Sequence, residues 1–345
     1  MTVLVDVQNL TRRFPVGRAI PFVGAQRVVT AAHDVSFQVH EGETLGLVGE
    51  SGCGKSTIGK LVLGLLAPSG GSVRFRGREV SARRGSTEWR QMRRQMQMVF
   101  QNPFGALNPR LKIGTQINEI LATHAIGEAT DRPQRLAELL QSVGLEAHML
   151  ERYPHQMSGG QLQRAVIARA LAVSPSFIVC DEAVAALDVS IQAQVVNLLL
   201  DLQEAHGLTY LFISHDLGIV RHICDRVVVM YLGRVVETGP TAEVFSAPRH
   251  PYTQALIAAA PQPDPRARRQ GAPLDGDPPS PLNPPSGCVF HTRCPMATSE
   301  CARSVPILRD MGSSGHTVAC HHADKMETTE DTARPLELLE AAHAR

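Results

Sequence analysis

A glycine-rich stretch, GESGCGKST, has the spacing G-x-x-x-x-G-K-S. It follows the apolar run TLGLV, which predicts a buried strand, and it precedes TIGKLVLGLL, which predicts a helix. Glycines let successive backbone N–H groups point at phosphate oxygens, and the helix start adds partial positive charge. In such a loop Lys55 would reach the terminal phosphates and Ser56 would offer its hydroxyl to Mg²⁺. The spacing therefore predicts a nucleotide-binding loop made of Gly49, Glu50, Ser51, Gly52, Cys53, Gly54, Lys55, Ser56 and Thr57.

Two adjacent carboxylates end the apolar run FIVC, and they could supply the rest of a metal site. Asp181 could hold Mg²⁺, usually through water, and Glu182 could orient or deprotonate an attacking water. Carboxylates at a strand end can also form a simple turn or helix cap. Because a phosphate loop is present in the same chain, we interpret the pair as catalytic.

Two further polar residues follow predicted strands. His215 comes after the apolar run of TYLFIS, and Gln101 ends QMVFQ. The carboxyl ends of parallel strands meet at one edge of a sheet, where ligands bind. There His215 could hydrogen-bond a γ-phosphate or the attacking water, and Gln101 could contact Mg²⁺ or water. The alternatives are a packing or capping histidine and an amide that only begins a loop.

A second glycine-rich helix start occurs at MSGGQ, which contains Ser158, Gly159, Gly160 and Gln161. Helix N-termini bind anions, so this segment predicts a second phosphate-binding site. One loop already holds the nucleotide in this chain, so the second site makes sense if it faces a nucleotide bound to another subunit. Two copies, head to tail, would then enclose two ATP molecules. The alternative is an ordinary helix N-cap formed by Ser158.

The elements that must position these residues are predicted over residues 1–258. Buried or half-buried strands alternate with helical segments, which predicts an α/β fold with a largely parallel sheet. The strands are predicted at LVDVQNL, HDVSFQV, TLGLV, SVRFRG, RQMQMVFQ, SFIVC, TYLFIS and RVVVMY. Residues 102–173 have helical spacing throughout. A further helix would place Ile191, Val195, Leu198 and Leu202 on one face.

Composition excludes several classes of protein. The chain has 345 residues and a net charge of +1, so no basic field favours nucleic acid as a partner. No apolar run is long enough to span a membrane. The N-terminus MTVLVDVQNLTRRF lacks the pattern of a signal peptide, so we expect the chain to stay in the cytosol.

The composition changes after residue 258. Residues 259–287 include nine prolines and predict a linker, residues 288–325 form a cysteine-rich segment, and residues 326–345 are a polar tail. The nearby histidines are interpreted as surface residues; they are His291, His316, His321 and His322. No internal repeat is evident.

Four cysteines lie close together in this segment, with the spacing C-x5-C-x6-C-x18-C; they are Cys288, Cys294, Cys301 and Cys320. Disulfides are disfavoured in the cytosol, and the C-x2-C pairs of common zinc sites are absent. Four thiolates suit an iron–sulfur cluster (4Fe–4S), with zinc or unligated thiols as the alternatives. The other three, Cys53, Cys180 and Cys224, are interpreted as core or spectator thiols.

This ordered set of motifs resembles the nucleotide-binding subunits of ABC transporters over about residues 3–258. The resemblance implies an ABC-type P-loop fold, with a RecA-like core, an antiparallel β subdomain and a helical signature subdomain. It makes GESGCGKST the Walker A loop, Gln101 the Q-loop residue and MSGGQ the signature motif. It makes Glu182 the catalytic base after the Walker B strand, Asp188 the D-loop residue and His215 the switch histidine. Phe14 would stack on adenine, although it could equally be a sheet-core residue.

Three further segments, QNPFGALNPR, RHPYTQAL and PPSGCVFHTRCP, resemble the ATPases of dipeptide and oligopeptide importers, a group that also serves nickel. The resemblance implies ATP hydrolysis with Mg²⁺ at the cytoplasmic face of the cell membrane. It implies a second ATPase subunit, identical or paralogous, two transmembrane permease subunits contacted by residues 102–173, and an extracytoplasmic binding protein. It also implies an iron–sulfur cluster at the late cysteines, as in some members of the group.

Two other functions are weighed against the transporter subunit. A soluble ABC ATPase that acts on nucleic acid would need a coiled-coil insertion, duplicated ATPase domains or a basic face, and the chain has none of these. A regulatory subunit that binds ATP without hydrolysing it would lack the catalytic residues, whereas Glu182 and His215 are present.

Overall fold

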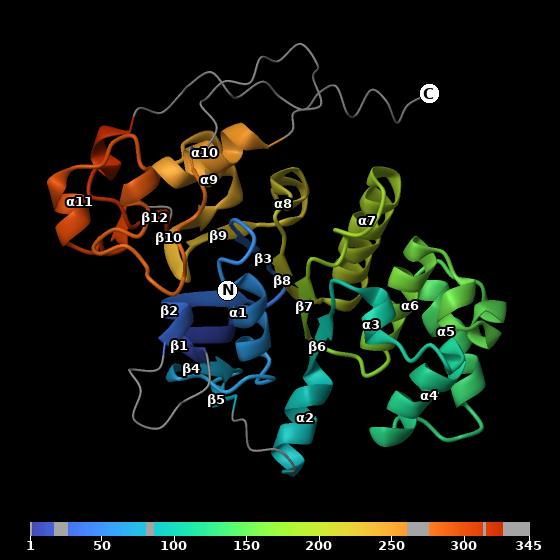
Figure 1. The fold of residues 1–345 in the computed structure, drawn as a ribbon. Helices are drawn as coiled ribbons and strands as arrows, with labels where there is room; N and C mark the ends of the chain where they lie inside the picture. The colour runs from blue at the N-terminus through green and yellow to red at the C-terminus, as the bar shows by residue number, and fades with distance from the viewer. Residues whose placement is uncertain (1, 17–26, 81–85, 261–275, 313–314, 327–345) are drawn as a thin grey trace.

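The computed structural model describes residues 2–16, 27–80, 86–260, 276–312 and 315–326 (Figure 1). The strands are β1 (Val3–Val16), β2 (Arg27–His40), β3 (Thr44–Val48), β4 (Gly70–Phe75), β5 (Arg78–Glu79), β6 (Met96–Val99), β7 (Phe177–Asp181), β8 (Thr209–Ile213), β9 (Arg226–Tyr231), β10 (Arg234–Pro240), β11 (Arg309–Asp310) and β12 (Thr317–Val318). The α-helices are α1 (Lys55–Val62), α2 (Thr87–Gln95), α3 (Pro103–Ala106), α4 (Ile113–Thr123), α5 (Arg132–Ser142), α6 (Gly159–Leu171), α7 (Val189–His206), α8 (Leu217–Ile223), α9 (Thr241–Ser246), α10 (Pro251–Ala259) and α11 (Ser299–Arg303). Short 3₁₀ helices are η1 (Ala147–Glu151), η2 (Pro154–Gln156), η3 (His291–Arg293) and η4 (Ala323–Lys325).

The larger sheet has the strand order β11-β12-β10-β9-β3-β8-β7-β6. Its strands β9, β3, β8, β7 and β6 are parallel, which confirms the predicted parallel sheet. Every residue of β3, β7 and β8 is buried, because helices cover a parallel sheet on both faces. The carboxyl ends of these strands therefore meet at one edge, where the predicted polar residues follow them.

A second, antiparallel sheet has the order β2-β1-β4-β5, and it matches the expected antiparallel subdomain. Its apolar side chains, such as Val5 and Val39, share one core with Ile58 and Leu61 of α1 and with Leu45 of β3. This core fixes the helix that follows the phosphate loop. Residues 17–26, between β1 and β2 in the sequence, lie outside the described residues.

A helical lobe, α3 to α6, lies between β6 and β7 and forms one side of the molecule (Figure 1, green). Ile117 and Leu121 of α4, Leu140 of α5 and Leu162 and Val166 of α6 are buried in its core. The helical interpretation of residues 102–173 is confirmed, since α3 begins at Pro103 and α6 ends at Leu171.

Two elements differ from the sequence prediction. The strand predicted at RQMQMVFQ is only Met96–Val99, because α2 occupies the chain up to Gln95. Helix α2 has no buried residue, and the side chain of its N-cap, Ser86, accepts a hydrogen bond from Trp89 N. The only apolar residues of α2 are Trp89 and Met92, so its periodic signal is weak, which explains why the pattern did not reveal it.

The C-terminal region, here residues 276–326, joins the larger sheet. Strand β12 pairs antiparallel with β10, and β11 pairs with β12. His316, predicted to be a surface residue, is buried, and its Nε2 atom lies 2.7 Å from Oε1 of the buried Glu237. That prediction was wrong because the strand pairing carries His316 over β10. Residues 261–275 of the predicted linker and 327–345 of the polar tail lie outside the described residues.

Candidate active site

The phosphate loop connects β3 to α1, as the sequence predicts. Gly54 lies at its end with φ of 107°, in the left-handed region, and a Cβ atom there would lie 2.0 Å from the carbonyl oxygen of Ala31. Only glycine fits that position. The loop thus passes against β2 before it turns into the N-terminus of α1.

Lys55, the first residue of α1, has only 4% of its surface exposed. Its Nζ atom donates hydrogen bonds to the carbonyl oxygens of Gly49, at 2.7 Å, and Glu50, at 3.0 Å. The ammonium group therefore lies within the curve of the loop, with its charge satisfied by loop carbonyls. A phosphate that binds in the loop would meet this charge without a large rearrangement of the chain.

Ser56 and Asp181 meet at the end of β7. The Ser56 hydroxyl donates a hydrogen bond of 2.7 Å to Oδ1 of Asp181. Burial raises the pKa of the Asp181 carboxyl, and the Ser56 hydrogen bond opposes that rise. A buried carboxylate beside a hydroxyl favours a bound cation, and both are oxygen ligands of the kind that Mg²⁺ prefers. These residues fit a magnesium site.

Glu182 lies between the two other polar residues predicted at the sheet edge. Gln101 Nε2 donates to Oε2 of Glu182 at 2.6 Å, and His215 Nδ1 lies 3.5 Å from Oε1. The Glu182 side chain is 14% exposed and the His215 side chain 57% exposed. Three strand ends, β6, β7 and β8, thus bring an amide, a carboxylate and an imidazole together, as the sequence predicts.

The MSGGQ segment begins α6, and Ser158 is its N-cap. Ser158 Oγ accepts a hydrogen bond from Gln161 N, and Gln161 Oε1 accepts one from Ser158 N. The N-cap interpretation is therefore confirmed, and it leaves the anion-binding interpretation open. A Cβ atom on Gly160 would lie 2.6 Å from Cγ2 of Ile191, so glycine lets α7 approach the tip of α6.

Asp188 caps the neighbouring helix, α7. It accepts hydrogen bonds from Ile191 N at 3.0 Å and from the Ser190 hydroxyl at 2.7 Å. The Ser190 hydrogen bond lowers the pKa of the Asp188 carboxyl. The Asp188 carboxylate is therefore charged at neutral pH. It lies six residues after Glu182 in the sequence.

Phe14 lies on β1 and is half-buried. The guanidinium of Arg12 lies 4.6 Å from the centre of its ring. Phe14 is not among the residues that build the core shared by β1 and α1, so the sheet-core alternative is wrong.

Sequence reasoning missed a group of residues that contact Glu50 of the phosphate loop. The Glu50 amide donates to the hydroxyl of Tyr252 at 2.8 Å, and Arg293 forms an ion pair with the Glu50 carboxylate at 2.9 Å. Arg293 also donates to the hydroxyl of Tyr231. These residues come from α10, β9 and η3, far from Glu50 in the sequence, and no local pattern could have identified them.

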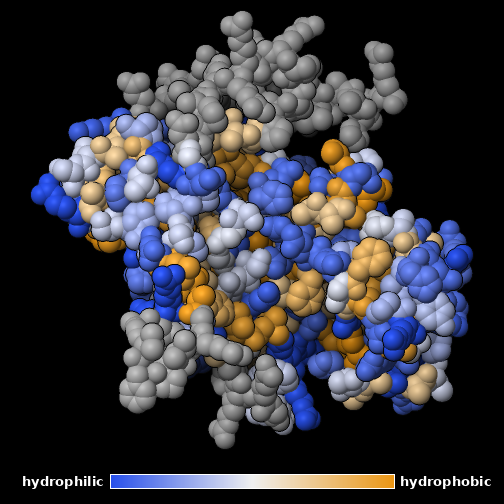
Figure 2. Space-filling view, in the orientation of Figure 1, coloured by the Kyte–Doolittle hydropathy of each residue, from blue (hydrophilic) through white to orange (hydrophobic). Residues whose placement is uncertain are grey.

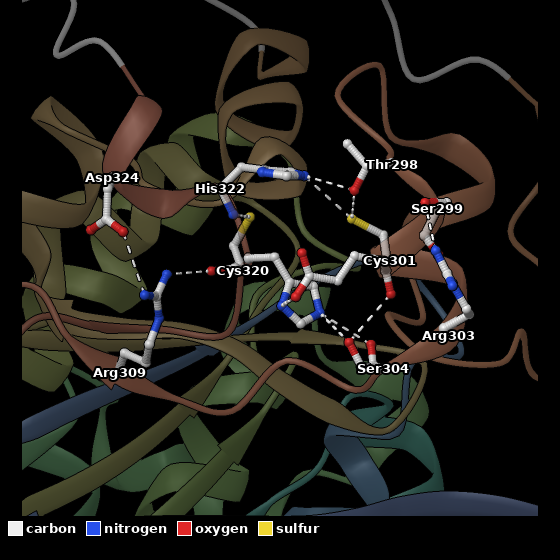
Figure 3. A network of polar contacts seen from close by, with 11 residues as sticks. Thr298, Ser299, Cys301, Arg303, Ser304, Arg309, Cys320, His322 and Asp324 are labelled. Carbon is white, nitrogen blue, oxygen red and sulfur yellow. Dashed lines mark hydrogen bonds and ion pairs between the residues drawn. The ribbon is translucent and has the colours of Figure 1, made fainter.

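The four late cysteines occupy one part of the C-terminal region. Cys301 Sγ lies 3.5 Å from both His322 Nε2 and Thr298 Oγ1, and Cys320 Sγ accepts from His322 N at 3.4 Å (Figure 3). Burial, the largest cause, acts together with the nearby Cys288, Cys294 and Cys301 to raise the pKa of Cys320 to about 11. Within the described ranges, however, no three histidine, cysteine or acidic side chains are arranged to hold a metal ion.

The remaining cysteines behave as predicted. Cys53, Cys180 and Cys224 are buried and unpaired with other thiols. Burial raises the pKa of each thiol, which keeps all three neutral at physiological pH.

The fold and the residues at its sheet edge define a class, the P-loop nucleoside triphosphatases. The family model described as "ABC transporter" matches residues 32–185, and the model "Oligopeptide/dipeptide transporter, C-terminal region" matches residues 236–301. The structure of the dimeric ATP-binding cassette MJ0796, bound to ADP and Pi, matches with a TM-score of 0.60 and 28% identity, over 69% of this chain and 99% of that chain. CbiO1 from Clostridium perfringens matches with a TM-score of 0.60 and 27% identity, over 71% of this chain and 91% of its own.

Relatives found by sequence similarity match more of this chain than the solved structures do. The probable peptide ABC transporter ATP-binding protein y4tS of Sinorhizobium fredii is 52% identical over 92% of this chain and 89% of its own length. The oligopeptide transport ATP-binding protein OppF of Salmonella typhimurium is 47% identical over 94% and 97%. The chain therefore belongs to the ATP-binding subunits of the ABC transporter family, and it is an ATPase. Among the described helices, none has the length and apolar character needed to cross a bilayer.

Proposed function

We propose that this chain is the ATP-hydrolysing motor subunit of an importer for dipeptides or oligopeptides. The single observation that carries the proposal is the convergence of Gln101, Glu182 and His215 beside the Ser56–Asp181 pair. That cluster provides a base, a metal site and a phosphate contact at one sheet edge. The peptide substrate is supported by the names of the relatives y4tS and OppF, and by the family match of residues 236–301.

Each residue has a role in this proposal. Backbone N–H groups of residues 49–57 and the Lys55 ammonium hold the β- and γ-phosphates, while Phe14 contacts the adenine. Ser56, Asp181 and Gln101 hold Mg²⁺, which when bound neutralises phosphate charge. Glu182 accepts a proton from the attacking water, and His215 contacts the γ-phosphate.

Ser158, Gly159, Gly160 and Gln161 act on the nucleotide of a second ATPase subunit, identical or paralogous, and Asp188 lies at the same contact. This proposal is supported by the structure of the helix start: α6 begins with two glycines, and its N-terminus carries partial positive charge. Such a site binds a γ-phosphate that another loop already holds. ATP then stabilises the paired state, and hydrolysis releases it.

We assign the permease contact to the groove between β6 and the helical lobe. It has a volume of about 140 Å³ and is lined in part by Met98, Phe100, Ala106 and Val166. Phe104 nearby is 56% exposed. Over the helical lobe, apolar and polar residues are interspersed on the face seen in Figure 2. Two transmembrane permease subunits would hold the chain at the cytoplasmic face of the membrane, and an extracytoplasmic binding protein would deliver the substrate.

The experiment measures ATP-dependent uptake of a radiolabelled dipeptide and a tripeptide by membrane vesicles that contain the complete transporter. Uptake should require ATP and should disappear with Lys55→Met. Uptake of nickel but not of peptide would identify the metal as substrate instead. Copurification with nucleic acid rather than with membrane proteins would favour the nucleic-acid alternative, which the net charge of +1 disfavours.

We further propose that Cys288, Cys294, Cys301 and Cys320 hold an iron–sulfur cluster, with zinc as the alternative. The proximity of the four thiols and the burial of three of them support it. Their present arrangement does not fit a metal, so binding would have to draw the sulfur atoms together. An anaerobically purified chain should show broad visible absorption and bound iron, and both should be lost with Cys320→Ser but kept with Cys224→Ser. A colourless chain with zinc, or without metal, would contradict the cluster.

A further inference from the structure

We infer that Arg293, in the C-terminal region, is a positioning residue for the phosphate loop, and that tight binding of ATP depends on it. Arg293 would act through Glu50, the second residue of the loop, and it would not touch the nucleotide itself. The inference rests on the proposed role of residues 49–57 in binding phosphate. It makes the C-terminal region a working part of the ATP site.

The contact between the two residues is bidentate. Arg293 Nη1 donates to Oε2 of Glu50 at 2.9 Å, and Nη2 donates to Oε1 at 3.2 Å. The Arg293 side chain is only 6% exposed and that of Glu50 24% exposed. Bidentate pairs of arginine and carboxylate fix orientation as well as distance, and burial protects this pair from screening by salt. The carboxylate of a loop residue is thus held in one direction by a residue 243 positions away.

The Glu50 backbone is held from the same side. Its amide donates to the hydroxyl of Tyr252, on α10, at 2.8 Å. The rings of Tyr231, Tyr252 and Phe290 pack together, with centroid separations of 4.7 to 5.4 Å. The Tyr231 hydroxyl also accepts a hydrogen bond from Arg293, at 3.2 Å. Phe290 and Arg293 both come from the C-terminal region, so this region completes the aromatic wall behind the loop.

Glu50 in turn contacts Lys55, the residue proposed to bind phosphate. The carbonyl oxygen of Glu50 accepts a hydrogen bond from Lys55 Nζ at 3.0 Å. Glu50 is therefore anchored at its side chain by Arg293, at its amide by Tyr252 and at its carbonyl by Lys55. If Arg293 is removed, a largely buried carboxylate loses its charge partner, and the loop must rearrange to hydrate it. A loop that must be ordered again on binding holds its ligand less tightly.

The C-terminal region is attached firmly enough to carry such a residue. Strand β12 pairs with β10, and the buried Glu237 of β10 accepts hydrogen bonds from the backbone of Arg249 and His250 and lies 2.7 Å from His316. Arg293 is the last residue of η3 and precedes Cys294, one of the four clustered thiols. The loop contact is therefore made from a folded part of the chain.

The test compares variants of the full-length chain by equilibrium binding of a fluorescent ATP analogue and by the kcat and KM of ATP hydrolysis. Arg293→Met should weaken binding and raise KM by about 10-fold, with kcat at saturating ATP within about 2-fold, since the contact acts before the chemical step. Arg293→Lys should weaken binding less, because it keeps the charge without the bidentate geometry. The matched control, Arg303→Met, removes an exposed arginine whose bonds are to Ser299 of its own helix, and it should change neither quantity.

The double variant isolates the pair. Glu50→Gln should weaken binding by itself, and Glu50→Gln with Arg293→Met should be no weaker than Arg293→Met alone. Losses that multiply, or an Arg293→Met chain that binds ATP like the parent, would overturn the inference. If Arg293→Met does not fold, Arg293→Lys carries the test, since its effect should vanish when Glu50 is already Gln. The Lys55→Met variant separates the two proposals. If it binds ATP normally, the proposed role of the phosphate loop is wrong. If it binds ATP poorly while the Arg293→Met variant binds ATP normally, only the inference about Arg293 is wrong.

Discussion

At the scale of single residues, Glu182 has the most unusual position in the site. Its φ of 48° lies in the left-handed region, which residues other than glycine rarely adopt. The Glu182 amide donates to the carbonyl of Ile213 at 2.9 Å, which holds this conformation at the end of β7. Backbone strain that the surrounding structure maintains is common at functional sites. Here it turns the carboxylate toward Gln101 and His215.

Replacing Glu182 with Gln tests its role as the base. The amide keeps the size of the side chain but cannot accept a proton, so ATP turnover should fall by about 100-fold or more while ATP binding persists. The measurement is phosphate release at saturating ATP. Glu204→Gln, on the exposed face of α7, is the matched control and should leave turnover unchanged. Normal turnover in the Glu182→Gln chain would remove this residue from the mechanism.

Sequence could predict the residues of this edge because each lies at the end of a strand or within two residues of it. Asp181, His215 and Gln101 needed only the strand periodicity and the rule that parallel strands end together. Arg293 could not be predicted in this way. Its contact with Glu50 depends on how the C-terminal region folds back onto β9 and β10, and spacing in the sequence does not encode that.

At the scale of elements, α10 connects the phosphate loop to the C-terminal region. Its N-cap is His250, whose Nδ1 accepts a hydrogen bond from Tyr252 N at 3.0 Å. The imidazole is fully buried, and this burial lowers its pKa from 6.5 to about 3. The Tyr252 hydroxyl also accepts a hydrogen bond from the Glu50 amide, so the start of α10 helps to position the phosphate loop.

This buried imidazole predicts a loss of stability in mild acid. Below pH 6.5 the unfolded chain protonates His250 while the folded chain keeps it neutral, so stability is full above pH 6.5 and falls toward about pH 3. The expected loss is about 1.4 kcal/mol per pH unit. Denaturant unfolding between pH 7 and pH 5 should therefore be less pH-dependent for His250→Asn, which retains a capping side chain. His222→Asn, exposed on α8, should keep the parental slope; equal slopes for all three chains would contradict the assignment.

Elements with a clear apolar period were predictable, and those held by tertiary contacts were not. Val195, Leu198 and Leu202 are buried on α7, as the helical spacing indicates, while Ile191 is only partly buried near the tip of α6. The short strands β11 and β12 have two residues each, too short to show any alternation. Strand β12 forms because β10 offers it an open edge, and β11 then pairs with β12.

At the scale of the whole molecule, the ATP site proposed here is complete only when two ATPase subunits pair. In this proposal each chain supplies a phosphate loop, a base and a metal site at the sheet edge, and the tip of α6 contacts the nucleotide of its neighbour. The dimeric arrangement is known for the similar cassette MJ0796, whose structure was determined as a dimer with ADP and Pi. The proposal assigns in-trans phosphate binding to this tip because α6 begins with two glycines after the Ser158 N-cap.

The most direct measurement is a structure of the assembled transporter that carries Glu182→Gln, captured with Mg²⁺ and ATP. We predict that Ser158 Oγ and the amide of Gly160 lie within hydrogen-bond distance of the γ-phosphate held by the partner ATPase subunit, whether that subunit is identical or a paralogue. An assembly with ATP bound in the phosphate loop, but with the tip of α6 facing solvent or turned away from the partner's nucleotide, would contradict the account.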